Sequence, residues 1–248
     1  MSKVMIVTGG SRGIGAATVL RAVRAGYRVA FSYASDEAAA ARMVADAEEA
    51  GGQAIAVRGD MGTEEGVLAL FAASDEAFGP PDVLVNNAGI TGRIVRVADM
   101  TFDEVRRLMD VNVTGVLIAS REAIRRMSTA MGGEGGSIIH LSSRASLLGG
   151  GGEWAHYGAS KGAIDTLTIG LAREVGGEGI RVNAIRPGLI DTEIHARAGA
   201  PDRLERLRSG VPLGRAGTAA EVAEAVIWLA SDAASYVSGS FIDVSGGR

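Results

Sequence analysis

The chain contains no cysteine and only three histidines, His140, His156 and His195. Without cysteine, a disulfide scaffold, a thiolate metal site, a cysteine nucleophile and a redox dithiol are all excluded. No histidine lies three or four residues from another, so a histidine-built zinc site is not expected either. Chemistry in this protein must therefore come from other side chains or from a bound organic cofactor.

An excess of basic residues is also missing, because 25 lysines and arginines stand against 29 aspartates and glutamates, for a net charge of −4. A general nucleic-acid binder usually carries a basic stripe, so no nucleic-acid partner is expected. No apolar run approaches the roughly 18 residues of a membrane helix, and the first residues, Met-Ser-Lys-Val, do not resemble a signal peptide. These absences predict a cytoplasmic protein without a membrane partner.

Short apolar runs rich in β-branched residues alternate along the chain with longer, alanine-rich stretches. The expected strands are residues 4–8, 28–33, 53–58, 83–86, 137–141, 180–185 and 241–244, and the expected helices include 14–25, 36–50 and 155–175. This alternation is typical of a parallel sheet covered on both faces. We therefore expect one α/β domain over residues 1–248, with a doubly wound, Rossmann-like sheet. The least regular stretch, at about 192–215, is expected to be a substrate lid.

The first expected strand runs into a glycine-rich turn, Thr8-Gly-Gly-Ser-Arg-Gly-Ile-Gly15. Glycine makes up 36 of the 248 residues, about twice its usual share, so a glycine pattern alone carries little weight. Between a strand and a helix, however, such a turn lets the backbone approach a pyrophosphate at the helix N-terminus. The alternative is a purely structural turn. We expect it to bind a dinucleotide through Gly9, Ser11, Arg12, Gly13, Ile14 and Gly15.

The end of the second strand bears on the choice of cofactor. In many NAD-specific sheets an acid at this point holds the ribose 2′-hydroxyl. Here the strand ends at Tyr33, and the first acid is Asp36. The missing acid leaves room for a 2′-phosphate, which the guanidinium of Arg12 is suited to bind. This pattern favours NADP(H); NAD(H) remains the alternative if Arg12 is only a solvated charge.

Two further strand ends carry candidate cofactor contacts. Asp60 could accept a hydrogen bond from the adenine amino group, with Met61 giving a backbone contact, or Asp60 could instead cap the following helix. After the fourth strand, Asn87, Ala88 and Gly89 are small enough to let the chain lie close to a flat cofactor.

A serine, a tyrosine and a lysine form the main catalytic hypothesis. Ser143 follows the fifth strand, and Tyr157 and Lys161, four residues apart, share one face of the expected helix. A tyrosine that exchanges protons near neutral pH needs its pKa lowered from about 10 by roughly 3, which is about 4 kcal/mol. A nearby ammonium and the positive nicotinamide ring could supply this stabilisation. Taken alone, such a pair is more commonly an ordinary surface pair.

Taken in order, these motifs resemble the short-chain dehydrogenase/reductase family over essentially the whole chain. The resemblance is to its short members, such as glucose dehydrogenases and 3-oxoacyl-(acyl-carrier-protein) reductases. It covers the glycine turn, Asn-Asn-Ala-Gly at 86–89, Asn112, the set Ser143, Tyr157 and Lys161, and Pro-Gly-Leu-Ile-Asp-Thr at 187–192. One departure is the interval of 14 residues from Ser143 to Tyr157, one longer than the commonest family spacing.

The resemblance implies a role for each matching residue. Tyr157 would give or take the proton on the substrate oxygen, and Ser143 would orient that oxygen. Lys161 would lower the pKa of Tyr157 and bind the nicotinamide ribose, while Asn112 would position the water of a proton relay. The loop that holds the nicotinamide would comprise Pro187, Gly188, Ile190 and Thr192. A homotetramer is implied as well.

The substrate pocket is expected to be walled by residues 91–97, 145–156 and 192–212. Trp154 either lines its entrance or packs at a subunit interface, and His156 is expected to be a polar surface residue. The leading hypothesis is hydride transfer between NADP(H) and the carbonyl or secondary alcohol of a small molecule. The alternatives are an NAD-preferring sugar or alcohol dehydrogenase, an epimerase or dehydratase, whose known examples are usually longer, and a catalytically silent cofactor sensor.

Overall fold

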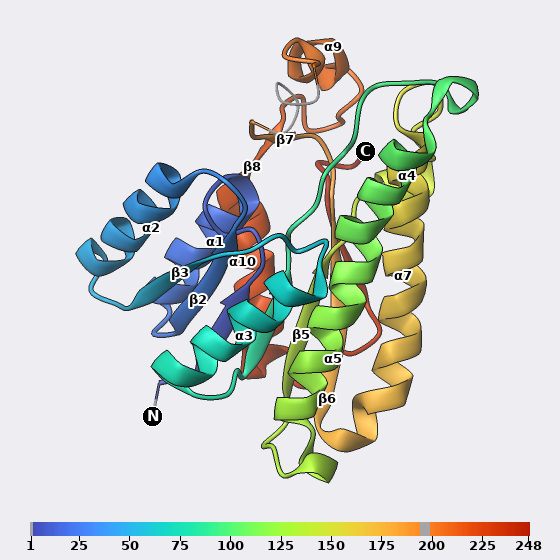
Figure 1. Ribbon diagram of the computed structural model, residues 1–248. Coiled ribbons are helices and arrows are strands. Elements are labelled where there is room, and N and C mark those ends of the chain that lie inside the picture. Colours follow the sequence, from blue (N-terminus) through green and yellow to red (C-terminus); the bar gives the residue numbers. More distant parts are fainter. Residues whose placement is uncertain (1, 194–198) are drawn as a thin grey trace.

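A seven-stranded parallel sheet forms the centre of the protein in the computed structural model, which describes residues 2–193 and 199–248 (Figure 1). The strand order is β3-β2-β1-β4-β5-β6-β9, and β7 pairs separately with β8. The bounds are β1 (Val4–Val7), β2 (Arg28–Tyr33), β3 (Ala54–Arg58), β4 (Val83–Asn86), β5 (Gly136–Leu141), β6 (Ile180–Pro187), β7 (Ile190–Asp191), β8 (Gly217–Thr218) and β9 (Phe241–Val244).

Helices cover both faces of this sheet, which confirms the predicted doubly wound α/β architecture. Helices α1, α2 and α10 pack on one face, and α3, α5 and α7 pack on the other. The bounds are α1 (Gly13–Arg24), α2 (Glu37–Glu49), α3 (Glu64–Phe78), α4 (Phe102–Met109), α5 (Gly115–Met127), α6 (Ala145–Leu148), α7 (Ala155–Val175), α9 (Arg203–Arg208) and α10 (Ala219–Ala230).

Successive residues of the first strand show how the pleat builds two cores. Met5 and Val7 belong to the apolar cluster under α1, α2 and α10, whereas Ile6 belongs to the cluster under α3, α5 and α7. All three side chains are fully buried. Because neighbouring residues of a strand point to opposite faces, a strand covered on both sides must be apolar throughout. That requirement explains the continuous apolar runs in the sequence.

The chain changes direction along the sheet at its first strand, because β1 pairs with β2 on one side and with β4 on the other. In open α/β sheets, ligands bind outside the carboxyl ends of the strands at such a switch point. The loops that follow β1, β4 and β5 all reach this region. They carry the glycine turn, the segment 86–92 and the segment 142–154, so the fold assembles the predicted motifs at one edge.

Most predicted elements agree with the observed bounds to within two residues. The helix predicted over 155–175 coincides with α7, and the strand predicted over 180–185 continues to Pro187. One local feature was not predicted: residues 110–114 form a π-helical turn between α4 and α5. Among the residues described, no helix is long and apolar enough to cross a membrane, and no group of potential metal ligands is found.

Candidate active site

The glycine turn packs so tightly that part of it has no room for side chains. A Cβ on Gly15 would lie 2.1 Å from the carbonyl oxygen of Gly9 and 2.6 Å from Nδ2 of Asn87. Gly9 has φ +69°, in the left-handed region that favours glycine. The amide of Asn87 holds the turn, because its Nδ2 donates to the carbonyl oxygens of Thr8 and Gly9, both at 2.9 Å. The sequence pattern therefore reflects a real close approach of two loops.

The N-terminus of α1 opens directly from this turn. Arg12 precedes the helix and makes no side-chain capping bond, and the first turn contains no acidic residue. The positive end of the helix dipole is thus left uncompensated by the side chains around it. An anion such as a pyrophosphate is stabilised at such an end. Ser11, Gly13 and Ile14 line the cleft at this point.

The end of β2 presents no carboxylate to the cleft. Ser32, Tyr33 and Ala34 line it, whereas Asp36 caps α2 by accepting a hydrogen bond from the Ala39 amide at 3.0 Å. Arg12 also lines the cleft, with Nη1 3.9 Å from Oε2 of Glu193. The Glu193 side chain is 71% exposed, so this contact is weak and leaves the guanidinium able to bind an anion.

Asp60 lies at the cleft but does not cap the next helix, so that alternative is wrong. Thr63 caps α3 instead, through a hydrogen bond from the Gly66 amide at 3.1 Å. Asp60 accepts from the Gly62 amide and from Nη2 of Arg107, each at 2.9 Å. The bond from Arg107 lowers the pKa of Asp60 more than burial raises it. Asp60 therefore stays a charged acceptor beside Met61, which also lines the cleft.

Sequence reasoning did not identify Arg107, because it comes from α4, far along the chain. A local sequence pattern around Asp60 cannot predict a contact made by a side chain from another helix.

Asn112 lies within the π-helical turn and is fully buried. Its side-chain amide makes two hydrogen bonds with the backbone of Ile90: Oδ1 accepts from the Ile90 amide at 2.9 Å, and Nδ2 donates to the Ile90 carbonyl at 2.8 Å. Nδ2 also lies 3.1 Å from Oγ of Ser160, on α7. Asn112 therefore links the chain after β4 to the helix that carries Tyr157 and Lys161. A Cβ on Gly89 would meet Asn112 Oδ1 at 3.3 Å and Lys161 Nζ at 3.6 Å.

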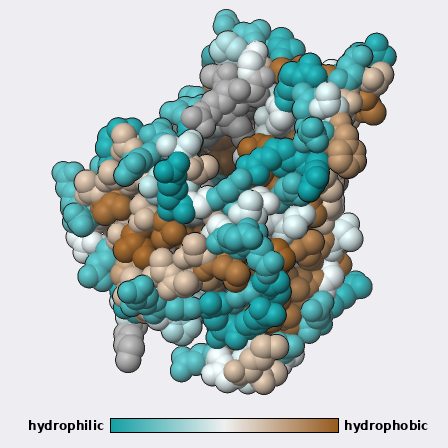
Figure 2. Space-filling view, in the orientation of Figure 1, coloured by the Kyte–Doolittle hydropathy of each residue, from teal (hydrophilic) through white to brown (hydrophobic). Residues whose placement is uncertain are grey.

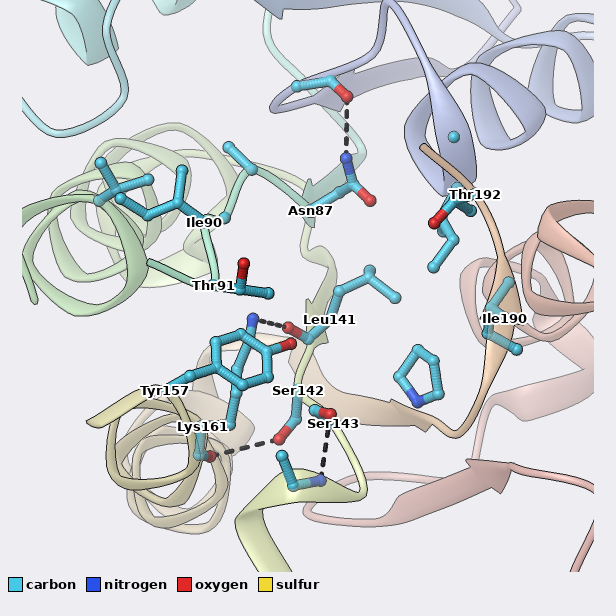
Figure 3. Close-up of a pocket in the computed structure, with 18 of the residues that line it drawn as sticks. Asn87, Ile90, Thr91, Leu141, Ser142, Ser143, Tyr157, Lys161, Ile190 and Thr192 are labelled. Carbon is cyan, nitrogen blue, oxygen red and sulfur yellow. Dashed lines mark hydrogen bonds between the residues drawn. The ribbon is translucent and has the colours of Figure 1, made fainter. Parts of the chain in front are cut away.

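Ser143, Tyr157 and Lys161 converge at one side of the cleft, as Figure 3 shows. The Nζ of Lys161 donates to the Leu141 carbonyl at 2.5 Å and lies 5.8 Å from the centre of the Tyr157 ring. Oγ of Ser143 accepts from the Ala145 amide at 3.1 Å, and the Ser143 hydroxyl is also hydrogen-bonded to Tyr157. Ser143 comes from the loop after β5, and Tyr157 and Lys161 come from α7.

Burial controls the proton affinities of this group. It raises the pKa of Tyr157, and a hydrogen bond with Ser143 acts in the opposite direction. It lowers the pKa of Lys161 from 10.5 to about 8, against the charge of Asp165, which raises it. The protein groups by themselves thus keep Tyr157 protonated at neutral pH, in contrast to the lowering that the sequence argument required.

Ser142, the neighbouring serine, belongs to a different set of contacts. Its Oγ lies 2.6 Å from Oδ1 of Asp165 and 3.2 Å from the Lys161 carbonyl. Asp165 in turn accepts from Nε of Arg186 at 3.0 Å. Ser142 and Ser143 both line the cleft, but the Ser142 hydroxyl is bonded to α7.

The loop after β6 forms the wall that faces Tyr157. Pro187, Gly188, Ile190 and Thr192 all line the cleft, and Figure 3 shows Ile190 and Thr192 across the cavity from Tyr157. The Gly188 amide donates to the Val244 carbonyl at 2.9 Å, which ties this loop to β9. Of the predicted lid, α9 is seen, and residues 194–198, with His195, lie outside the described residues.

Trp154 and Glu153 form the outer wall together with α9. The Trp154 ring meets the Tyr157 ring edge to face, with 6.4 Å between their centres, and the guanidinium of Arg203 lies 4.1 Å from the Trp154 ring centre. Arg203 also pairs with Glu153. The sequence placed Trp154 at the entrance as one of two alternatives. Glu153 and Arg203 lie in the predicted wall segments, but their pairing, which spans 50 residues, was not predicted.

His156 is buried, so its expected position on the surface is wrong. Burial lowers the pKa of its imidazole, and Glu104 acts weakly in the other direction. A Cβ on Gly92 would lie 2.6 Å from Nε2 of His156, so the ring packs against the chain after β4. It therefore supports the wall of the cleft and stays neutral near pH 7.

The cleft lined by Ser143, Tyr157 and Lys161 has a volume of about 930 Å³. This is near the upper end of the roughly 300–1,000 Å³ typical of ligand pockets. The glycine turn lies at one end, and Ser143, Tyr157 and Lys161 lie toward the other. A pyrophosphate-binding backbone, an acceptor at Asp60 and small residues at 88–89 fit an extended dinucleotide. These features define the class of protein: one that binds a dinucleotide beside a tyrosine, a lysine and a serine.

Comparisons with known proteins agree with this class. Residues 9–248 match the family described as enoyl-(acyl carrier protein) reductase. The uncharacterized oxidoreductase YgfF of Escherichia coli is 49% identical over 245 residues, which cover 99% of both chains. 3beta-hydroxysteroid dehydrogenase 1 of Eggerthella lenta is 42% identical over 99% of this chain and 93% of its own.

A solved structure is similar over the same length. A short chain dehydrogenase from Burkholderia cenocepacia J2315, crystallised in complex with NADP, shares 35% of its residues with this chain and has a TM-score of 0.91. The alignment covers 99% of this chain and 97% of that one. The chain thus belongs to the short-chain dehydrogenase/reductase family, whose enzymes act on alcohol and carbonyl groups.

Proposed function

We propose that this protein reduces the carbonyl group of a small molecule with NADPH, and catalyses the reverse oxidation of the secondary alcohol. One observation supports this most: Tyr157, Ser143 and Lys161 meet at one end of a cleft whose other end is an uncapped helix N-terminus beside a glycine turn. The cofactor, when bound, supplies or accepts the hydride. Every other part of the reaction is assigned to side chains of the chain itself.

Residues of four loops would hold the cofactor. The turn from Gly9 to Gly15 would take the pyrophosphate, and Asp60 with Met61 would take the adenine. Asn87, Ala88 and Gly89 would line the middle of the site, and Pro187, Gly188, Ile190 and Thr192 would hold the nicotinamide end. The tight approach of Gly15 to Gly9 supports this assignment, because a side chain on Gly15 would force the turn apart.

The proton of the reaction is assigned to Tyr157. Burial keeps its hydroxyl protonated at neutral pH, so it is ready to donate as negative charge develops on the substrate oxygen. Ser143, which is hydrogen-bonded to Tyr157, would orient the same oxygen. Lys161 would bind the nicotinamide ribose and favour the tyrosinate left behind. Asn112 is proposed to support a proton relay by holding Ile90 against α7.

NADP(H) is the proposed cofactor, with NAD(H) a weaker one. Arg12 immediately precedes the uncapped helix α1. At the end of β2, Tyr33 lines the cleft where an NAD-preferring protein would have an acid. The similar dehydrogenase from Burkholderia cenocepacia was crystallised with NADP, which supports the same choice.

We further propose that the chain acts as a single domain with a lid at about 192–215, and that it assembles as a homotetramer. Leu117 on α5 and Ile169 on α7 are 45% and 40% exposed, and Figure 2 shows hydrophobic atoms along the edge where these helices lie. Apolar side chains on neighbouring long helices are suited to a symmetric interface.

The proposal is tested by following NADPH absorbance at 340 nm while a panel of aldehydes and ketones is added to the purified protein. We expect carbonyl-dependent NADPH oxidation, and a dissociation constant for NADPH below that for NADH in fluorescence titrations. Arg12→Met should remove most of that preference, while Arg24→Met, a control in the last turn of the same helix, should not. NADPH binding without oxidation by any carbonyl would favour a cofactor sensor instead.

A further inference from the structure

The walls around Tyr157 carry information about the substrate itself. Beyond the catalytic groups, the cleft is lined by apolar side chains that include Ile90, Leu148, Trp154, Leu189 and Leu207. They come from the loop after β4, from the segment between β5 and α7, from the turn between β6 and β7, and from α9. The edge-to-face contact of Trp154 with Tyr157 places a flat aromatic wall directly beside the reacting group.

Two charged residues of this wall, Arg203 and Glu153, form an ion pair. Arg203 pairs with Glu153, and its guanidinium lies over the Trp154 ring at 4.1 Å. Arg206 contributes a second contact to the same carboxylate, at 3.0 Å. The Arg203 side chain is only 14% exposed, so it is sealed between an aromatic face and a carboxylate. A substrate carboxylate could use Arg203 only by breaking this pair.

Arg144, which follows Ser143, is engaged in the same manner. Its Nη1 lies 2.5 Å from Oδ2 of Asp243, and its Nε donates to the Arg248 carbonyl at 2.7 Å. It therefore offers little to an anion beside Ser143.

Hydroxyl recognition is equally sparse among the described residues of this wall. Thr91 supplies a hydroxyl beyond those of Ser143 and Tyr157, and its Oγ1 lies 3.3 Å from the Gly92 carbonyl, which accepts its proton. The indole N–H of Trp154 is buried and has no hydrogen-bond partner in the described part of the chain. A sugar bound here would leave several hydroxyls without partners, and each would weaken binding.

We infer that the substrate is a neutral carbonyl compound with an apolar, ring-containing body, rather than a sugar or a carboxylate-bearing oxo compound. This inference rests on the proposed function and extends it to the substrate class. The Arg203–Glu153 pair acts as the selectivity element, because the Glu153 carboxylate engages the guanidinium that lies over the Trp154 ring.

Two ketones of matched shape test this inference: 4-methylacetophenone and 4-acetylbenzoate differ by a methyl group in place of a carboxylate. With NADPH, the wild type should reduce the neutral ketone with a kcat/KM at least about tenfold higher. Oxidation of D-glucose with NADP⁺ should be slower than oxidation of 1-(4-methylphenyl)ethanol. Equal rates for the two ketones, a preference for the carboxylate, or faster oxidation of glucose would overturn the inference.

Substitutions in the ion pair test the selectivity element directly. Glu153→Gln leaves the Arg203 guanidinium without its carboxylate, so it can bind the carboxylate of 4-acetylbenzoate. The kcat/KM for 4-methylacetophenone divided by that for 4-acetylbenzoate should therefore fall at least about fivefold. Adding Arg203→Met to this variant should restore the preference for the neutral ketone. Arg206→Met is the matched control, because it removes the more exposed arginine and keeps the Arg203 pair; its ratio should equal that of the wild type.

The outcomes separate this inference from the function on which it rests. If Glu153→Gln leaves the ratio unchanged while both ketones are reduced, the selectivity element is wrong and the reductase stands. If NADPH binds but neither ketone reacts, the inferred substrate class is wrong. If NADPH fails to bind, the proposed function falls as well.

Discussion

Replacement of Lys161 by methionine is expected to stabilise the cofactor-free protein at neutral pH while it removes catalysis. Lys161 is 5% exposed, and burial lowers its pKa from 10.5 to about 8. At about 1.36 kcal/mol per pH unit, holding this ammonium inside the fold costs about 3 kcal/mol at pH 7. Methionine has a similar length and carries no charge, so this cost disappears in the variant.

Part of the gain is offset by the hydrogen bond that the substitution removes. The Nζ of Lys161 donates to the Leu141 carbonyl at 2.5 Å, and leaving a buried acceptor with one partner fewer costs about 1–2 kcal/mol. The net gain is therefore about 1–2 kcal/mol, which raises the melting temperature of a chain of this size by roughly 3–6 °C.

The sign of the pH dependence distinguishes this explanation from improved packing. Below pH 8 the lysine is charged in both states, so the folded protein bears the full cost. Between pH 8 and 10.5 the folded state loses its proton first, and the stability of the wild type rises with pH. At pH 9.5 the cost of the buried Lys161 ammonium should be lower than at pH 7 by about 2 of the 3 kcal/mol.

Urea unfolding of wild type and Lys161→Met at pH 7 and pH 9.5 measures this directly. The variant should be more stable at pH 7 and no more stable than the wild type at pH 9.5. Lys3→Met is the control, because Lys3 is half exposed and should change stability by less than about 0.5 kcal/mol at either pH. A loss of stability at pH 7, or a gain that does not change with pH, would refute the reasoning.

Two other substitutions test the cofactor cradle and the fold. Gly15→Ala places a methyl group 2.1 Å from the Gly9 carbonyl oxygen, so the turn must open, and NADPH affinity should fall at least about tenfold in a fluorescence titration; unchanged affinity would show that the turn does not bind the cofactor. Thr218→Ala removes the capping box of α10, in which Thr218 and Glu221 satisfy each other's backbone amides, and should cost about 1 kcal/mol by urea unfolding. An unaltered midpoint would mean that this cap contributes nothing.

The periodicity of the sequence was sufficient to predict the sheet and most helices. A strand buried on both faces is mostly apolar, and this requirement leaves a continuous apolar run in β1 and a shorter one within each of β2 and β5. Likewise α7 begins and ends at the predicted residues, 155 and 175. The π-helical turn at 110–114 has no periodic sequence pattern of this kind. Its Asn112 makes hydrogen bonds with the backbone of Ile90, which lies 22 residues away in the sequence.

The candidate site was predictable where its residues follow strands in sequence, and not where distant elements supply them. The glycine turn and the Tyr157–Lys161 spacing are local patterns, and the structure brings these residues to one cleft. Arg107 reaches Asp60 from 47 residues away, and Arg203 reaches Glu153 from 50. His156 was predicted to lie on the surface because a lone histidine usually does, whereas in the structure it is buried and packs against Gly92.

The central claim is that Tyr157 supplies the proton for carbonyl reduction, and Tyr157→Phe tests it most directly. The substitution removes the hydroxyl oxygen and keeps the ring that packs against Trp154. With a carbonyl substrate and NADPH, kcat should fall by about 10²–10⁴, while the dissociation constant for NADPH changes less than about threefold. Tyr236→Phe, at a fully exposed position, should leave both values unchanged. A Tyr157→Phe variant that retains a near-wild-type kcat would contradict the assignment of the proton to this residue.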